Sequence, residues 1–238
     1  MKIGLFDSGI GGLNVLSEFL KKYPNNIYYY YGDTKNVPYG DKDKNTLFEL
    51  SKRIIHFFEE KEVDLIIIAC GTVSASCYQE LKELTSIPIL DIISPTINYI
   101  NRQSFSKVLV FATNRTINSH IFRERLNKKT IEVSTPEFVP MIENRCIDPS
   151  IIKKYIAYEN DIDALVLGCT HYPLLINYLN EFLPDNVTLI NMGKCLVDDI
   201  NITNNTKQEI HLFFSKIDDL LKKNIEYIIP FNYTLDEE

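Results

Sequence analysis

The sequence predicts an α/β protein made of two similar parallel-sheet halves, related by approximate two-fold pseudo-symmetry. Apolar segments of four to seven residues alternate with amphipathic segments of ten to fifteen, which is the pattern of βαβ units. The segment VDLIIIACGT at 63–72 aligns without a gap with IDALVLGCTH at 162–171. The opening segment KIGLFDSG at 2–9 aligns in the same way with KVLVFATN at 107–114. We therefore expect two related domains with the active site in the cleft between them.

The first half follows the β-α alternation from its first residues. Each expected strand is a short run rich in Ile, Tyr or Leu, and each expected helix has apolar residues at helical spacing. The expected strands lie at 2–6, 27–31, 64–69 and 88–93, and the expected helices near 11–22, 45–61 and 72–84. This half should end near Ser94 and Pro95.

The second half repeats the alternation up to the polar segment NITNNTK at 201–207. Its expected strands lie at 107–112, 130–134, 163–168 and 187–190, and its expected helices near 116–127, 149–158 and 172–183. The last segment offers one more strand at 211–214 and a short helix at 217–223, which we expect to return to the first half. The predicted domains are therefore residues 1–95 with about 207–238, and residues 96–206.

Composition excludes several classes of protein. The chain has 238 residues, 45% of them apolar, which is enough for a sizeable core. It has no apolar run long enough to cross a membrane, and its start lacks the features of a signal peptide, so we expect a cytoplasmic protein. The net charge of −7 argues against a nucleic-acid partner. Five Cys residues without a CxxC motif argue against a disulfide framework and a metal site. The oligomeric state stays open, and a homodimer is one possibility.

Two cysteines end two equivalent strands, and this is the strongest chemical signal in the sequence. Cys70 and Cys169 occupy matching positions in the first alignment. A single cysteine at a strand end is more often an inert core residue than a reactive one. Ligands of open α/β sheets, however, bind at the carboxyl ends of the strands, where helix N-termini favour anions and lower thiol pKa values. Two thiols facing one carbon from opposite sides would suit the inversion of a stereocentre, since one removes a proton and the other delivers one.

Six motifs in order resemble the signature of glutamate racemases, within the aspartate/glutamate racemase family. They are FDSGIGGL at 6–13, YGDTKNVPYG at 31–40, ACGTVSAS at 69–76, ATNRTINS at 112–119, FVPMIE at 138–143 and LGCTHYPLL at 167–175. The resemblance extends to about Asp199, and the last forty residues look shortened or diverged. It implies cofactor-independent proton transfer at the α-carbon of L- or D-glutamate, a small-molecule substrate, giving D-glutamate for bacterial peptidoglycan.

The resemblance also implies a role for individual residues. Cys70 would act on the D-enantiomer and Cys169 on the L-enantiomer. Asp7 and His171 would assist proton transfer, and Glu143 matches a carboxylate near the second thiol. The positions that would hold the substrate's amino and carboxylate groups are Asp7, Ser8, Pro38, Tyr39, Gly40, Gly71, Thr72, Thr113, Thr116, Thr170 and His171.

Other interpretations stay open at this point. Asp7 could be a helix cap, and His171 a cap or a packed ring. The segment GIGG at 9–12 resembles a nucleotide loop, but Asn14 replaces the last Gly of GxGxxG, and a GK[ST] motif is absent from the sequence. The alternatives to glutamate racemase are an aspartate racemase, another amino-acid racemase, a one-Cys decarboxylase of the same superfamily, or a catalytically silent binding protein on this scaffold.

The sequence departs from the family pattern at one catalytic motif. Relatives usually read Cys-Asn-Thr where this chain has Cys70, Gly71 and Thr72. A side-chain amide that would contact the substrate is therefore missing. We expect a water molecule to replace it, and we expect Gly71→Asn to lower KM for glutamate by up to roughly tenfold, worth about 1.4 kcal/mol.

Overall fold

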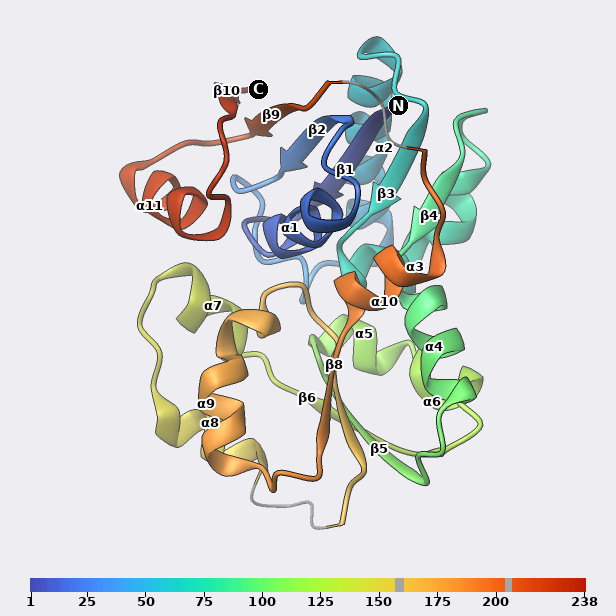
Figure 1. Ribbon diagram of the computed structural model, residues 1–238, viewed down its shortest axis with the longest axis vertical. Coiled ribbons are helices and arrows are strands. Elements are labelled where there is room, and N and C mark those ends of the chain that lie inside the picture. The colour runs from blue at the N-terminus through green and yellow to red at the C-terminus, as the bar shows by residue number, and fades with distance from the viewer. Residues whose placement is uncertain (157–160, 204–206) are drawn as a thin grey trace.

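The computed structural model contains two parallel β-sheets with helices packed around them, and it describes residues 1–156, 161–203 and 207–238. Figure 1 shows one sheet in the upper half of the molecule and the other in the lower half, with both chain ends at the top. The upper sheet has the strand order β10-β9-β2-β1-β3-β4 and the lower sheet β6-β5-β7-β8. The predicted α/β fold with two parallel-sheet halves is confirmed.

The upper sheet is built mostly from the first hundred residues. Its strands are β1 (Lys2–Asp7), β2 (Ile27–Gly32), β3 (Leu65–Ile68), β4 (Ile89–Asp91), β9 (Glu209–Phe214) and β10 (Thr234–Glu237). The helices of this half are α1 (Gly12–Lys22), α2 (Lys44–Glu60), α3 (Gly71–Lys82) and α11 (Asp219–Ile228). Helix α4 (Ile93–Arg102) leads from this half to the other, where Asn101 and Ser94 form hydrogen bonds with Arg125. Strand β9 pairs with β2, so the C-terminal segment returns to the first sheet.

The lower sheet comes from the middle of the chain. Its strands are β5 (Lys107–Ala112), β6 (Lys129–Ser134), β7 (Ala164–Leu167) and β8 (Thr188–Asn191). The described helices here are α5 (Asn114–Asn118), α6 (Ile121–Arg125), α7 (Phe138–Glu143), α8 (Pro149–Ile156), α9 (Ile176–Phe182), α10 (Met192–Asp199) and the 3₁₀ turn η1 (Tyr172–Leu175). We propose that the two sheets define the domains 1–95 with about 207–238, and 96–206.

The two sheets repeat one another in strand order and in register. The order β2-β1-β3-β4 corresponds to β6-β5-β7-β8. Ile3 of β1 lies opposite Leu65 of β3, and Val108 of β5 lies opposite Ala164 of β7. The sequence alignments relate these same two pairs of residues. Cys70 and Cys169 therefore follow equivalent strands of two equivalent sheets.

Several helices differ from the sequence-based expectation, each for a local reason. The strand expected at 88–93 ends at Asp91, because the Asp91 carboxylate accepts hydrogen bonds from the N–H groups of Ile93 and Ser94 and starts α4. The helix expected near 116–127 is divided into α5 and α6 at His120, whose φ of 55° is left-handed. Helix α11 extends to Ile228, beyond the expected 217–223.

The remaining differences are helix ends and missed elements. The helix expected near 172–183 begins as a 3₁₀ turn containing Pro173 and becomes α-helical only at Ile176. The helix expected near 149–158 is described as far as Ile156, and its last two positions lie outside the described residues. The expectation did not include α4, α7, α10 or β10.

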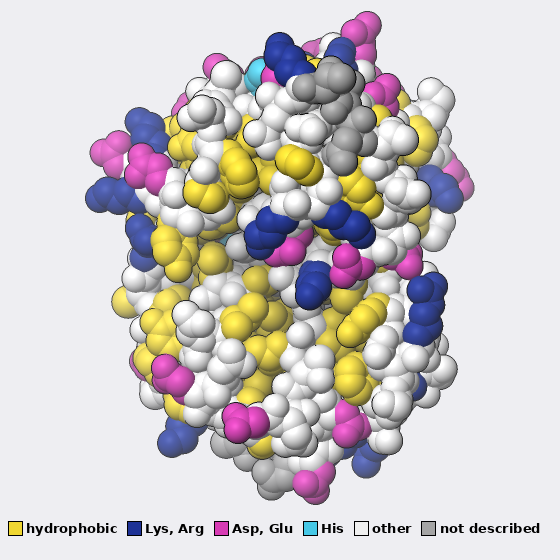
Figure 2. All heavy atoms as spheres, in the orientation of Figure 1, with side chains coloured by type: hydrophobic (Ala, Val, Ile, Leu, Met, Phe, Trp, Pro, Cys, Tyr) yellow, Lys and Arg dark blue, Asp and Glu magenta, His cyan; other side chains and the backbone are white. Residues whose placement is uncertain are grey.

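Helix α10 connects the two halves. It follows the last strand of the lower sheet and packs against α1 of the upper half and against α4, which lies between the two halves. Figure 2 shows basic and acidic side chains gathered across the middle of this face, in the region of α10. The ion pairs there join Lys22 to Asp198 at 3.3 Å and Arg102 to Asp199 at 3.7 Å. This packing helps to hold the carboxyl ends of both sheets toward each other. No described helix combines the length and apolar character that a membrane span requires.

Candidate active site

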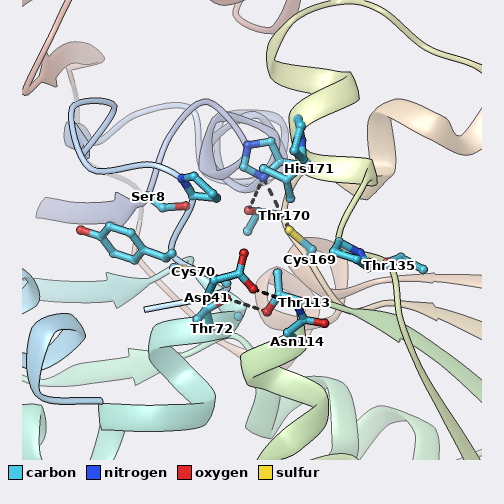
Figure 3. A pocket seen from close by; sticks show the side chains of 17 residues that line it. Ser8, Asp41, Cys70, Thr72, Thr113, Asn114, Thr135, Cys169, Thr170 and His171 are labelled. Carbon is cyan, nitrogen blue, oxygen red and sulfur yellow. Dashed lines mark hydrogen bonds between the residues drawn. The ribbon is translucent and has the colours of Figure 1, made fainter. Parts of the chain in front are cut away.

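Both strand-end cysteines face one small pocket between the two sheets. The pocket has a volume of about 60 Å³, and Figure 3 shows Ser8 and Cys70 on its left and Cys169 on its right. Its walls are formed by Ser8, Pro38, Tyr39, Gly40, Asp41, Cys70, Gly71, Thr72, Thr113, Asn114, Thr135, Pro136, Val139, Pro140, Cys169, Thr170 and His171. The two thiols that the alignment paired are therefore neighbours of the same cavity.

The local fold explains why each thiol reaches the pocket. Cys70 lies two residues after the buried strand β3 and is the N-cap residue of α3. Cys169 follows β7 at the equivalent place, just before the 3₁₀ turn. The two residues are only 4% and 8% exposed, so each thiol is largely withdrawn from bulk water.

Cys169 begins a chain of polar contacts that runs through His171 to Glu143. Nδ1 of His171 lies 3.5 Å from the sulfur of Cys169, and Nε2 donates a hydrogen bond to Oε1 of Glu143 at 2.7 Å. Burial disfavours the charged imidazole. The hydrogen bonds and negative charges of Cys169 and Glu143 outweigh burial and raise the pKa of His171 well above 6.5. The imidazolium form is therefore favoured beside Cys169.

Asp7 links the two halves from behind the pocket wall. Its carboxylate accepts hydrogen bonds from the backbone N–H of Gly12 at 2.8 Å and from the hydroxyl of Thr170 at 3.2 Å. Burial raises the pKa of Asp7, although the charge of His171 and the N–H groups of Gly12 and Ser8 oppose this effect. Asp7 is thus both a cap of the turn before α1 and a buried ionisable group beside the thiols.

The pKa of Cys70 contradicts the sequence-based expectation. The N-terminus of α3 was expected to lower it, and the N–H groups of Val73 and Thr72 do act in that direction. Burial and the negative charge of Asp7 are stronger, and together they raise the pKa of Cys70 well above 9.0. Cys70 therefore rests as a neutral thiol.

A row of hydroxyl groups and a short loop join the halves on the other side of the pocket. Thr72 Oγ1 lies 2.9 Å from Thr113 Oγ1, which in turn lies 3.1 Å from Thr116 Oγ1. Asn114 donates a hydrogen bond to Asp41 at 2.7 Å, and Figure 3 shows this pair at the pocket edge. These contacts place hydroxyl groups of both halves at one wall.

Most of the residues predicted from the sequence line this pocket, and three do not. Asp7, Glu143 and Thr116 lie behind the wall and contact residues that form it. The sequence reasoning missed Asp41, Asn114, Thr135, Pro136, Val139 and Pro140. Thr135 could have been found, because it directly follows the strand expected at 130–134, at the same sheet edge as Cys169.

The environment of Gly71 corrects another expectation. A Cβ atom at this position would lie 2.9 Å from the backbone oxygen of Gly168 in the other half. A backbone carbonyl cannot rotate away as a flexible side chain can. The space needed for an asparagine side chain is therefore not free, and the two halves approach each other closely at Gly71.

The other titratable clusters offer no alternative centre. Among residues 1–156, 161–203 and 207–238, no group of three His, Cys, Asp or Glu side chains is arranged as a metal site. All five cysteines are free. Burial raises the pKa of Cys77 to about 11 and that of Cys195 to about 12, so both are neutral core thiols.

The raised pKa of Asp7 predicts a stabilising substitution. Because the folded pKa exceeds the ordinary value of 3.8, the stability contribution of Asp7 is present below pH 3.8 and lost as pH rises through the folded value. Asp7→Asn removes the destabilisation caused by the ionised carboxylate and keeps a side-chain oxygen that accepts from the backbone N–H of Gly12. We expect the free energy of unfolding at pH 7 to be about 0.5–2 kcal/mol higher for the variant than for the wild type. Urea denaturation from pH 3.5 to 8 measures the difference.

Asp163 provides a control of opposite sign. Its carboxylate accepts hydrogen bonds from the backbone N–H groups of Lys107 and Ser106, which lower its pKa. Its stabilising contribution is present above pH 3.8 and lost as pH falls through the lowered value. Asp163→Asn should therefore reduce stability at pH 7. Equal effects of the two substitutions would contradict the pKa directions.

Comparisons with known proteins agree with this arrangement. Residues 33–144 match the family model described as Asp/Glu/Hydantoin racemase. The chain is 38% identical to the glutamate racemase of Hydrogenobaculum sp. strain Y04AAS1, over 99% of this chain and 95% of that protein. It is also similar to the solved glutamate racemase of Campylobacter jejuni subsp. jejuni, with 32% identity, a TM-score of 0.89, and 98% and 100% of the two chains covered.

A second solved structure is that of glutamate racemase from Francisella tularensis subsp. tularensis in complex with D-glutamate. This chain is 28% identical to it, with a TM-score of 0.88, and 99% of this chain and 96% of that chain are covered. The similarity extends over the whole chain, including the C-terminal segment that follows Asp199. This protein therefore belongs to the glutamate racemase family.

Proposed function

We propose that this protein interconverts L- and D-glutamate by proton transfer at the α-carbon, without a cofactor, and so supplies D-glutamate for peptidoglycan. The observation that carries the proposal is the position of Cys70 and Cys169 at one pocket, on equivalent strands of two sheets. The full-length similarity to glutamate racemases supports the choice of substrate. The five free cysteines support a cytoplasmic location, where thiols stay reduced.

The two thiols have different surroundings, and this difference suits the reaction. Burial and Asp7 keep Cys70 protonated, so it can act as the acid when Cys169 acts as the base. The imidazolium of His171 favours negative charge on the Cys169 sulfur. Proton abstraction from L-glutamate by Cys169 and delivery by Cys70 gives D-glutamate, and the reverse steps return L-glutamate.

The pocket walls suit the amino and carboxylate groups of a small amino acid. Hydroxyl groups of Ser8, Thr72, Thr113 and Thr170 line the pocket, together with the side chains of Asp41 and Asn114. Arg115 is not among the lining residues, and its guanidinium donates a hydrogen bond to Ser76 at 3.3 Å. Holding the substrate carboxylates by hydroxyl groups rather than by Lys or Arg side chains avoids stabilising both thiolates at once, and the mechanism requires one of the two to be protonated.

The alternatives differ in what they require of this pocket. A one-Cys decarboxylase would not need a second thiol at the equivalent strand end, and both thiols line the pocket here. For an aspartate racemase the thiols could be the same, but the full-length relatives are glutamate racemases and favour glutamate. A silent binding protein would keep the walls and lack turnover, so an assay separates it from an enzyme.

Incubation with each glutamate enantiomer in D₂O tests the proposed function. Each enantiomer should yield its antipode carrying deuterium at Cα, without added pyridoxal phosphate, because the proton is delivered by a thiol that exchanges with solvent. Chiral chromatography with mass spectrometry measures both the product and its label. Turnover of aspartate alone would reassign the substrate, and the absence of turnover with any amino acid would indicate a binding protein.

Two substitutions of Gly71 separate the steric effect of a Cβ atom near Gly168 from the effect of a side-chain amide that could contact the substrate. Gly71→Ala places Cβ against the oxygen of Gly168 and should destabilise the fold by about 1–3 kcal/mol and raise KM. Gly71→Asn carries the same Cβ and adds an amide that can contact the substrate. We now expect KM to be up to roughly tenfold lower for the asparagine variant than for the alanine variant, and not below that of the wild type. Thermal unfolding and steady-state kinetics of the three proteins measure both effects.

A further inference from the structure

The loop after β2 carries four residues of the pocket wall, Pro38, Tyr39, Gly40 and Asp41, and one buried carboxylate holds this loop. Asp33 is only 4% exposed. Its Oδ2 accepts a hydrogen bond from the hydroxyl of Tyr39 at 2.6 Å, and the amide of Asn36 donates to both carboxylate oxygens at 2.9 and 3.0 Å. Asp33 thus connects the start of this loop to the residue that reaches the pocket.

The C-terminal segment supplies the remaining partner of Asp33. The hydroxyl of Ser215, directly after β9, donates to Asp33 Oδ1 at 2.7 Å and accepts from the backbone N–H of Lys35 at 2.9 Å. The next residue, Lys216, exchanges two hydrogen bonds with the hydroxyl of Thr34, at 2.6 and 3.2 Å. Two consecutive residues of the C-terminal segment, Ser215 and Lys216, therefore hold the loop by hydrogen bonds, and we call this set of contacts the clasp.

Tyr39 connects the Asp33 carboxylate to the pocket wall. Its side chain is 1% exposed and lines the pocket, while its hydroxyl is bonded to Asp33. Burial and the Asp33 charge raise the pKa of Tyr39, which keeps the phenol protonated as a donor. The neighbouring Gly40 accepts a hydrogen bond from the backbone N–H of Arg115 in the other half. The position of this wall therefore depends on the loop that Asp33 and Ser215 hold.

We propose that Asp33 and Ser215 are positioning residues that hold Tyr39 in the pocket wall, so that the C-terminal segment sets the shape of the substrate site. Tyr39 contributes the wall, and Ser215 acts through Asp33 without contacting the substrate. The kinetic part of this inference rests on the proposed racemase function. The structural part, the clasp on residues 33–39, does not depend on the activity.

Hydrogen exchange tests the clasp without any substrate. Ser215→Ala removes the acceptor of the Lys35 N–H and one donor to Asp33, so amide exchange in residues 33–39 should become at least about tenfold faster. Ser215→Thr keeps the hydroxyl and should retain most of the protection. Thr234→Ala is the control, because the Thr234 hydroxyl forms a hydrogen bond with His211 in the same C-terminal segment, at 3.0 Å, and not with the loop at 33–39. Equal exchange in the alanine variants at 215 and 234 would overturn the clasp.

Kinetics of single and double variants test whether Ser215 acts through Tyr39. Ser215→Ala should raise KM for both glutamate enantiomers by about three- to tenfold, the effect of one lost hydrogen bond, with kcat changed less than about twofold. In a Tyr39→Phe background the tether to Asp33 is already absent, so the same substitution should change KM by less than about twofold. Multiplicative effects in the double variant, or an effect on kcat alone, would overturn the positioning role.

The two experiments separate failure of the inference from failure of the proposed function. If the wild-type protein does not racemise glutamate, the proposed function fails, and hydrogen exchange still supports or overturns the clasp. If the wild type is active and Ser215→Ala behaves like Thr234→Ala in both measurements, the inference fails and the proposed function stands.

Discussion

Replacement of either Cys70 or Cys169 by serine should lower kcat/KM for glutamate racemisation by more than about 10³-fold. A serine hydroxyl is far less acidic than a thiol, so it can neither remove the α-proton nor exist as the conjugate base near neutral pH. Both thiols line the pocket from different halves, and Cys77, Cys146 and Cys195 are not among its lining residues. Cys146→Ser is the matched control, because that thiol is exposed and lies outside the pocket.

Isotope exchange distinguishes the two thiols in these variants. With Cys70 replaced, Cys169 can still remove and return the α-proton of L-glutamate, so L-glutamate should exchange with D₂O without inversion. With Cys169 replaced, D-glutamate should exchange instead. Proton NMR of the Cα–H signal measures the exchange. Exchange of the same enantiomer in both variants would contradict the assignment of one thiol to each face.

Replacement of His171 by asparagine should lower kcat/KM at pH 7 by roughly 10²-fold. The imidazolium lies 3.5 Å from the Cys169 sulfur and is held by Glu143 at 2.7 Å, so its removal leaves the thiolate without its neighbouring positive charge. The loss must be equal in both directions, because the enantiomers have equal free energies in water. Direction-dependent effects can therefore appear only in kcat and KM separately.

The pH dependence identifies the electrostatic role of His171. Against the effect of burial, the hydrogen bonds and charges of Cys169 and Glu143 raise the pKa of His171, so the wild-type protein loses its imidazolium only as pH rises above 7 through that raised value. The deficit of the variant should therefore shrink over this pH range. Steady-state assays of both proteins across this range measure the effect. His56→Asn is the control, since His56 is an exposed residue of α2 that pairs with Glu59. A deficit that does not change with pH would indicate that His171 acts by shape alone.

Much of the fold followed from local patterns in the sequence. Buried parallel strands are short continuous apolar runs, and this property located β1, β2, β3, β5 and β7 to within one residue at each end. The gap-free alignments predicted equivalent strands in the two halves, and the structure shows that these strands pair in the same register in both sheets. The helix at 93–102 was missed because its start depends on Asp91, which the pattern assigned to the interior of a strand.

The sequence by itself determined the α/β repeat and the placement of two cysteines at equivalent strand ends, because strand and helix patterns depend on neighbours along the chain. Only the tertiary structure decided which charges and backbone atoms meet across the halves. Burial, and after it the negative charge of Asp7, raise the pKa of Cys70 against the effect of its helix. The oxygen of Gly168 fills the space beside Gly71, and Ser215 bonds to Asp33 although 182 positions separate them. Such contacts depend on how the sheets and the C-terminal segment pack, and local patterns carry no information about that packing.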